Sequence, residues 1–119
     1  MREPTFWILT ALATRPLHGY GVIQEAARLS GGQVTLQAGT LYAALDRLAA
    51  EGLVEPDHEE QVDGRTRRYY RLTSDGAAAL DAEAVRLQAS ALAATQQLAA
   101  RKRFGLGPAT SRALRPATP

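Results

Sequence analysis

Arginine side chains crowd one short turn of the chain, the stretch DGRTRR at residues 63–68. An Asp-Gly pair supplies the positive φ angles of a tight turn, so residues 53–61 and 65–73 are predicted to pair as a two-stranded hairpin. Guanidinium groups at the tip of a projecting hairpin can straddle a phosphate backbone or enter a narrow minor groove, where negative potential is concentrated. The turn is therefore a candidate contact for nucleic acid.

The same arginines have a second role open to them, because the facing strand is acidic. It carries three carboxylates that can pair with arginines across the hairpin: Asp57, Glu59 and Glu60. Both roles can hold at once for different side chains. Arg65 and Arg67 are the first candidates for DNA contact, while Arg68 and Arg71 are expected to be structural or shared between the two roles.

A second candidate contact is the sequence GTLY at residues 39–42, at the predicted start of a helix. The free N–H groups and the positive dipole end of a helix N-terminus suit a phosphate, and Gly39 lets a backbone come close. The Thr40 hydroxyl and the Tyr42 phenol lie away from the apolar face and can reach phosphates or base edges. Alternatively, Gly39 only loosens the helix start and Tyr42 covers the core, and the residues alone leave both readings open.

Neighbouring side chains extend this candidate surface. Gln37 and Ala38 stand at the start of the same helix, where a few base contacts would supply sequence choice, and the Gln37 amide can read adenine. Asp46 would repel phosphate or select a cytosine amine. Tyr20 either donates to a phosphate as its helix crosses the DNA backbone or packs the first helix onto the second.

Catalytic constellations fit this sequence badly. The chain has no cysteine, which excludes disulfides, thiolate metal sites and cysteine nucleophiles. His18 has no serine or carboxylate attached to it in a motif, and DHEE at residues 57–60 holds one histidine on a strand that divides the four side chains between two faces. Gly19-x-Gly21 lacks the third glycine and the preceding strand of a dinucleotide fingerprint. We predict no catalysis, no cofactor and no metal.

The helices that must position these residues are short. Pro4 opens a first helix that is apolar on most faces. A second helix is predicted over residues 18–30, with five apolar residues facing inward: Val22, Ile23, Ala26, Ala27 and Leu29. QVTLQ at residues 33–37 alternates apolar and polar side chains, as a very short strand would. A third helix from about Ala38 to Gly52 buries one leucine stripe: Leu41, Leu45 and Leu48.

The last third of the chain is predicted to hold one long helix. From Ser74 the sequence is alanine-rich and helical to about Arg103. Six apolar residues are spaced 4, 3, 4, 3 and 4 along it, as in a heptad seam: Leu80, Ala84, Leu87, Ala91, Ala94 and Leu98. Such a stripe implies a partner helix, and Phe6 and Trp7 of the first helix are expected to join the dimer core. Trp7 is also the candidate for stacking on a flat ligand, as an alternative to a plain role in the dimer core.

Together these elements predict a winged helix-turn-helix fold, mainly α with a small β-hairpin wing, followed by a long C-terminal dimerisation helix. The expected organisation is a DNA-binding domain over 1–73, a dimerisation helix over 74–103 and a disordered tail over 104–119, because the tail is rich in Gly, Pro, Ser and Thr without periodicity. In the hairpin Tyr69 and Tyr70 alternate, so one of them is expected in the core.

Three segments in order resemble the PadR family of bacterial transcriptional regulators: LHGYGVIQEA (17–26), AGTLYAALDRLAAEGLVEP (38–56) and GRTRRYYRLTSDGAAAL (64–80). The similarity runs from about Ile8 to Leu80, with one following helix as in the shorter branch of the family. The resemblance implies a homodimer that binds a pseudo-palindromic promoter site, usually as a repressor. It also implies release by a small, often aromatic ligand or by a change in the abundance of a partner.

Charge supports a rival hypothesis, a winged-helix module that binds proteins and has lost DNA binding. Residues 1–72 carry eight basic and nine acidic side chains, whereas residues 101–119 carry five basic and no acidic ones. The tail could therefore supply non-specific DNA attachment while the wing does little. The apolar run near the N-terminus is too short and poorly flanked for a secretory signal, and no stretch suits a membrane span, so a cytoplasmic location is expected.

Overall fold

The structure is a computed structural model of the chain, and it describes residues 1–106. The predicted disordered tail lies outside the described residues except for its first three. The described chain divides into a compact unit, Met1–Ala84, and a second unit that begins at Val85 within the last helix. No helix within residues 1–106 combines the length and apolar character that crossing a membrane requires.

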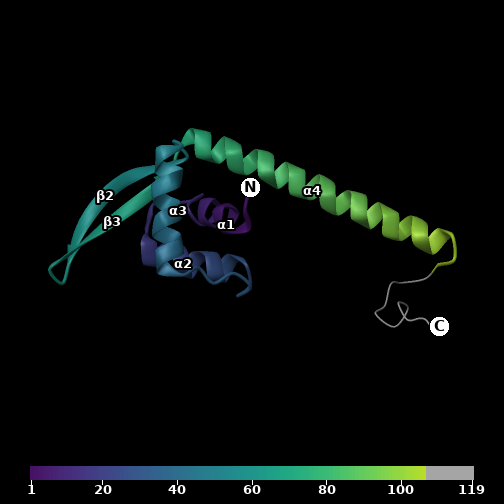
Figure 1. Cartoon of the computed structure of the whole chain (residues 1–119), viewed down its shortest axis with the longest axis horizontal. Coiled ribbons are helices and arrows are strands. Elements are labelled where there is room, and N and C mark those ends of the chain that lie inside the picture. Colours follow the sequence, from purple (N-terminus) through teal and green to yellow (C-terminus); the bar gives the residue numbers. More distant parts are fainter. Residues whose placement is uncertain (107–119) are drawn as a thin grey trace. The chain divides into compact units, whose positions relative to one another are not determined.

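The compact unit consists of helices around one core, with a hairpin projecting from them (Figure 1). In chain order the elements are α1 (Glu3–Ala11), β1 (Leu17–His18), α2 (Gly19–Leu29), α3 (Ala38–Ala50), β2 (Val54–Val62), β3 (Arg65–Leu72) and α4 (Ser74–Arg103). The three strands form one antiparallel sheet in the order β1-β3-β2. This arrangement confirms the predicted fold class, a mainly helical protein with a small β-hairpin wing.

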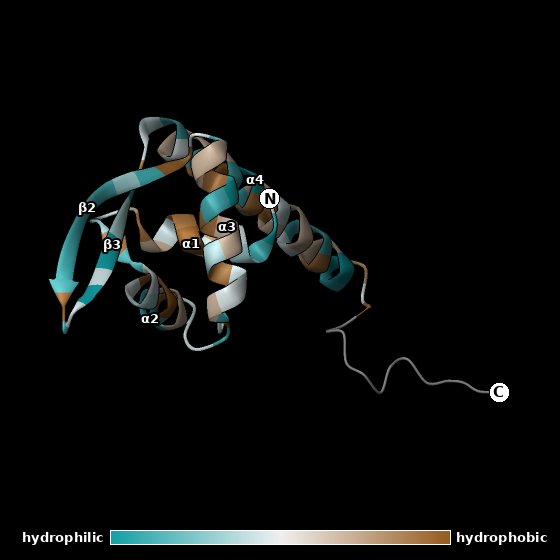
Figure 2. Cartoon of the chain, turned by 60° about the vertical axis from the view of Figure 1, so that its left-hand side comes forward, coloured by the Kyte–Doolittle hydropathy of each residue, from teal (hydrophilic) through white to brown (hydrophobic). Residues whose placement is uncertain are grey.

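The core is built from the apolar faces of the three short helices. The predicted stripe of α3 is confirmed, since Leu41, Leu45 and Leu48 are completely buried. They pack in one cluster with Ile8 of α1 and Val22 of α2. Figure 2 shows the contrast between the brown, apolar α1 and the mostly teal, polar hairpin. The hydrophobic effect thus fixes α3 against α1 and α2, with the polar face of α3 outward.

The hairpin turns as its sequence predicted. Asp63 and Gly64 have φ angles of 52° and 76°, and the ladder runs from Val62↔Arg65 towards Val54↔Leu72. A β-bulge between Pro56 and His58 leaves one extra residue in β2. Tyr70 is the buried member of the tyrosine pair, only 7% exposed, and it fastens β3 to the helical core.

Two predictions of local structure were wrong. Residues 33–37 form no strand; their alternation arises because Leu36 is buried and Val34 half-buried in a loop that follows two glycines with positive φ. The third strand is instead Leu17–His18, too short to leave a period-two pattern in the sequence. Leu29, expected to face inward, is 40% exposed because it ends α2, beyond Ala26, the last buried residue of that helix.

The helix α4 runs over the 30 residues that the sequence predicted. Its first turn packs tightly within the compact unit, because a Cβ on Gly76 would meet the carbonyl oxygen of Leu53. In the second unit the apolar side chains of α4 are open to solvent: Leu87 is 40% exposed and Leu98 54%. Phe6 and Trp7 of α1 are partly buried and meet edge to face at 5.2 Å.

Candidate nucleic-acid interface

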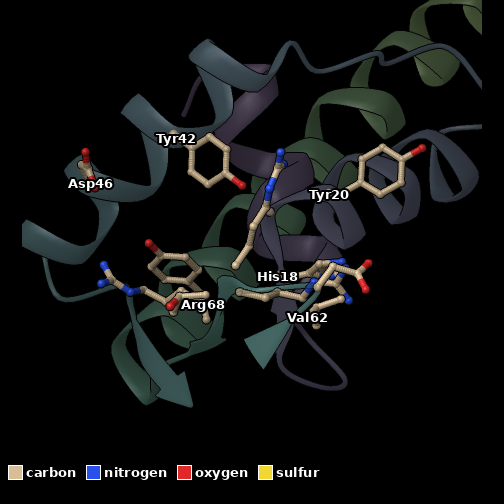
Figure 3. Close-up of a pocket in the computed structure, with 12 residues that line it drawn as sticks. His18, Tyr20, Tyr42, Asp46, Val62 and Arg68 are labelled. Carbon is tan, nitrogen blue, oxygen red and sulfur yellow. The ribbon is translucent and has the colours of Figure 1, made fainter. Parts of the chain in front are cut away.

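A groove of about 970 Å³ separates the helices from the wing in the compact unit. One wall comes from the start of α2 and from α3, with Tyr20, Tyr42 and Asp46. The other comes from the tip of the hairpin, including Arg65 and Arg67. Figure 3 shows Tyr42 and Asp46 on one side and Arg68 and Val62 on the other. The groove therefore gathers tyrosine and arginine side chains around one open space.

The start of α3 is an open surface at the side of this groove. Gln37 is the N-cap but its side chain makes no capping hydrogen bond, so the amide is not held by the helix. Gln37, Ala38, Gly39 and Thr40 are all exposed. A Cβ built on Gly39 would meet no atom within 4 Å. A phosphate or base edge can therefore approach the backbone of this turn closely.

Tyr42 joins α3 to the start of α2. Its side chain is half exposed, yet its ring lies directly against Gly19. The alternative that Tyr42 caps the core is not what the contacts show, because the ring lies over the first residue of a neighbouring helix and lines the groove. Tyr20, the other tyrosine of this wall, is 62% exposed.

The wing arginines divide into two groups. The Arg68 Nε donates to Glu59 over 3.4 Å, and Arg71 bonds Glu55 and Asp57 over 2.9 and 3.2 Å. Neither Arg65 nor Arg67 forms an ion pair with any residue of the described chain. The acidic strand β2 thus neutralises the base of the wing and leaves the guanidinium groups nearest the turn available to a ligand.

An aromatic stack at the base of the wing was missed by sequence reasoning. The Tyr69 ring lies between His18, at 5.2 Å, and His58, at 4.2 Å, and its hydroxyl donates to Glu60 over 2.8 Å. In the sequence, His18 and His58 stand out only as members of weak catalytic or metal motifs, and neither motif predicts an aromatic contact. The signal that could have found the stack is the pairing of β1 with β3, which no sequence pattern revealed. The described residues contain no cluster of three metal-ligating side chains.

Five of the predicted contact residues line the groove, and the other four stand at the start of α3. Tyr20, Tyr42, Arg65, Arg67 and Arg68 line the groove. Gln37, Ala38, Gly39 and Thr40 do not line it, but they begin the helix that carries Tyr42. Asp46 also lines the groove, which places a carboxylate among its cationic groups.

His18 is a titratable group whose pKa this packing perturbs. Burial lowers the pKa of His18 below its ordinary value of 6.5, the Arg67 guanidinium lowers this pKa further, and Glu60 acts in the opposite sense. Its Nδ1 is buried without a hydrogen-bond partner. The folded chain therefore favours the neutral imidazole.

This preference predicts a loss of stability in mild acid. The unfolded chain binds a proton near pH 6.5 while folded His18 resists it, so the contribution of His18 to the free energy of unfolding is full above that pH and declines below it. We expect urea unfolding of the wild type and of His18→Phe, compared at about pH 7.5 and about pH 5, to show a larger acid loss in the wild type. An equal acid loss in the two proteins would contradict the assignment.

Comparison with known proteins fits this geometry. Residues 8–82 match the model of the transcriptional regulator PadR-like family. A Mycobacterium tuberculosis protein named transcriptional regulator Rv3488 is 45% identical over 73 residues, which cover 61% of this chain and 64% of that protein. The chain thus matches slightly less than two thirds of this relative's length.

Solved structures show the same fold. A PadR family transcription regulator from Clostridium difficile has a TM-score of 0.64 at 25% identity, over 79% of this chain and 96% of that one. Bacillus subtilis PadR, in complex with operator DNA, has a TM-score of 0.63 at 21% identity, over 87% and 73% of the two chains. Because the family model covers more than half of the sequence and the winged helical fold agrees, this chain belongs to the PadR-like family of transcriptional regulators.

Proposed function

We propose that the chain binds double-stranded DNA in a sequence-specific manner, as a homodimeric repressor of a nearby promoter. The observation that carries the proposal is the division of the wing arginines: Arg65 and Arg67 border the groove without ion pairs in the described chain, while Arg71 is neutralised by β2. Guanidinium groups left without carboxylates beside a helix that begins with an exposed turn suit a phosphate backbone.

Each predicted contact has a role in this proposal. Thr40, Tyr42 and Tyr20 would donate to phosphates, while Gln37 and Ala38 at the start of α3 would meet base edges in the major groove. Arg65 and Arg67 would hold the flanking backbone or its minor groove, with Arg68 sharing this role when it leaves Glu59. The structure of Bacillus subtilis PadR with operator DNA supports this choice of ligand.

The homodimer rests on the exposed apolar seam of α4. Leu87 and Leu98 are open to solvent in a single chain, and they share the predicted heptad seam with Ala84, Ala91 and Ala94. Leu80, the first residue of the predicted seam, is instead partly buried against the core of its own compact unit. Burying such a seam against a second copy removes apolar surface from water. Two recognition helices would then address half-sites roughly 34 Å apart on a pseudo-palindromic operator.

A second candidate function is a protein-binding module without specific DNA binding. Its support is the number of carboxylates around the basic groups, since Glu25 pairs with Arg28 over 2.7 Å and Glu59 with Arg68 over 3.4 Å. A third is attachment to any DNA through the basic residues from Arg101 onward. The first experiment below separates all three.

The role of the wing is tested with the double variant Arg65→Ala/Arg67→Ala. Its binding to the DNA upstream of the protein's own gene (the upstream DNA) and to an unrelated duplex is measured at two salt concentrations. We expect preference for the upstream DNA in the wild type, and in the variant a weaker affinity whose dependence on log salt is shallower by about 2, one unit for each lost phosphate contact. Fluorescence anisotropy of labelled duplexes measures both quantities.

Arg15→Ala/Arg28→Ala is the matched control, because it removes the same charge from side chains that both approach Glu25 outside the groove. It should retain the preference for the upstream DNA, as should a chain that lacks residues 104–119. Equal binding to both duplexes, lost with the tail, would establish the attachment hypothesis. Absence of binding in the wild type would favour the protein-binding module.

The dimer is tested by a charge placed in the seam. Leu98→Glu should yield monomers and weaken operator binding at least tenfold, because a buried carboxylate opposes association and dimeric recognition needs both half-sites. Leu92→Glu is its control, an equally exposed leucine of the same helix outside the seam. Sedimentation velocity gives the mass of each variant, and a Leu98→Glu dimer would contradict the seam.

We extend the proposal to release from DNA by a small aromatic or hydrophobic ligand at Trp7. The chain contains one tryptophan, so intrinsic fluorescence reports on this site directly. A ligand that stacks on Trp7 should change its emission in a saturable way and lower operator affinity over the same concentration range. Titration with small aromatic acids such as benzoate tests this. A plain core role for Trp7 predicts no saturable change.

A further inference from the structure

Two adjacent residues, His18 and Gly19, contact the two elements that flank the groove, one element each. Gly19 contacts Tyr42 of α3, and His18 contacts Tyr69 of the wing. We propose that the His18-Gly19 dipeptide is a positioning device, which fixes where the recognition helix and the wing stand relative to each other. The inference rests on the proposed DNA-binding function, and it assigns to this dipeptide, which itself lines the groove, a role that acts through Tyr42 and Tyr69.

Gly19 is required for room rather than for backbone freedom. It is the first residue of α2 and has no positive φ angle, so any residue could adopt its backbone conformation. Alanine would be favoured over glycine in a helix. A Cβ at this position, however, would clash with the end of the Tyr42 ring, lying within 2.6 Å of its Cζ and 2.9 Å of its Cε1. The Tyr42 ring therefore occupies the space that a side chain at position 19 would fill, a contact we call the seat of Tyr42.

His18 acts on the wing in a comparable way. Its backbone pairs with Tyr69 in the β1–β3 ladder, and its imidazole stacks on the Tyr69 ring at an interplanar angle of 26°. The imidazole also lies against Gly21, where a Cβ would come within 2.9 Å of Nδ1. The imidazole thus contacts both the first turn of α2 and the wing. A displacement of α2 would therefore also displace the wing.

The consequence is a short link between two elements that DNA must meet together. Consecutive Cα atoms are about 3.8 Å apart across a trans peptide, so the seat of Tyr42 and the support of Tyr69 cannot move independently. A recognition helix and a wing fixed in this way lose little freedom on binding, which favours affinity for one geometry of the duplex. Specific binding should therefore depend on the dipeptide more than stability does.

The Gly19 contact is tested by a double-mutant cycle with Tyr42. Gly19→Ala should weaken operator binding about fivefold, the effect of one displaced hydrogen bond, and should not lower the melting temperature, because alanine suits the helix. In the Tyr42→Ala background the same change should cost nothing further. Additive losses, or a lowered melting temperature without a loss of affinity, would overturn the role assigned to Gly19.

The His18 contact has a conservative rescue. His18→Phe keeps a ring against Tyr69 and should retain operator affinity at about pH 7.5, where the imidazole is neutral. His18→Ala should weaken binding, and this loss should disappear in the Tyr69→Ala background. An equal loss in His18→Phe and His18→Ala would show that stacking on the wing is not what His18 contributes, and would overturn this half of the proposal.

A readout without DNA separates this inference from the proposed function. The four tyrosines can be labelled as 3-fluorotyrosine, and the Tyr42 signal is identified by its absence in Tyr42→Phe. In the free protein, Gly19→Ala should move the Tyr42 fluorine resonance towards the value of an exposed tyrosine. An unmoved resonance overturns the positioning role. A moved resonance in a protein that prefers no duplex supports the positioning role and leaves the proposed function as the part that fails.

Discussion

The pairing of β3 with the two-residue strand β1 is the constraint on which the wing depends. A two-stranded hairpin is marginally stable by itself in water, and one as polar as β2–β3 has little apolar surface to hold it in place. Tyr70 supplies part of that surface from β3, buried in the core opposite Leu17 of β1, and Val54 supplies another part from the start of β2. The next pair along, His18↔Tyr69, adds a stacked contact. These two residue pairs of the β1–β3 ladder help to fix β3, and with it the arginines of the turn, in position relative to α3.

Around this anchor, charge is distributed unevenly along a single hairpin. Near its base the arginines face carboxylates of β2 at hydrogen-bonding distance, and near its tip they have none within the described residues. Exposed ion pairs contribute little stability, typically below about 1 kcal/mol. Their main effect here is on the electrostatic field, because they confine the free positive charge to the part of the wing that borders the groove. A chain whose first 72 residues are slightly acidic can in this way still present a basic site.

The elements with strong local signals were predictable from the sequence, and those made by tertiary contacts were not. The leucine stripe of α3, the Asp63-Gly64 turn and the helix from Ser74 to Arg103 follow from periodicity and turn chemistry. β1 could not be found, because two residues carry no pattern and their strand conformation comes from β3. The loop at residues 33–37 was predicted as a strand because its apolar residues alternate with polar ones. The alternation arises because two apolar residues of the loop reach the core.

The same division holds for the candidate site. The types and order of Thr40, Tyr42, Arg65 and Arg67 indicated a surface for DNA, and the groove gathers three of these four. Which arginines pair with β2 depends on register, and the β-bulge at Asp57 changes that register in a way no propensity predicts. The seat of Tyr42 on Gly19 is a contact between two helices, so it becomes visible only when both are placed.

The bulge in β2 also affects how the open edge of the sheet can interact with other chains. Because the sheet order is β1-β3-β2, the outer edge of the nine-residue strand β2 has no neighbour within the described chain. Open edges of this length are templates on which other chains add strands and aggregate. Here Pro56 lacks an N–H, the bulge interrupts the regular spacing, and Glu59 and Glu60 repel a second copy of the same edge. The acidic strand β2, which neutralises the arginines at the base of the wing, is thereby also protected from the addition of a strand from another chain.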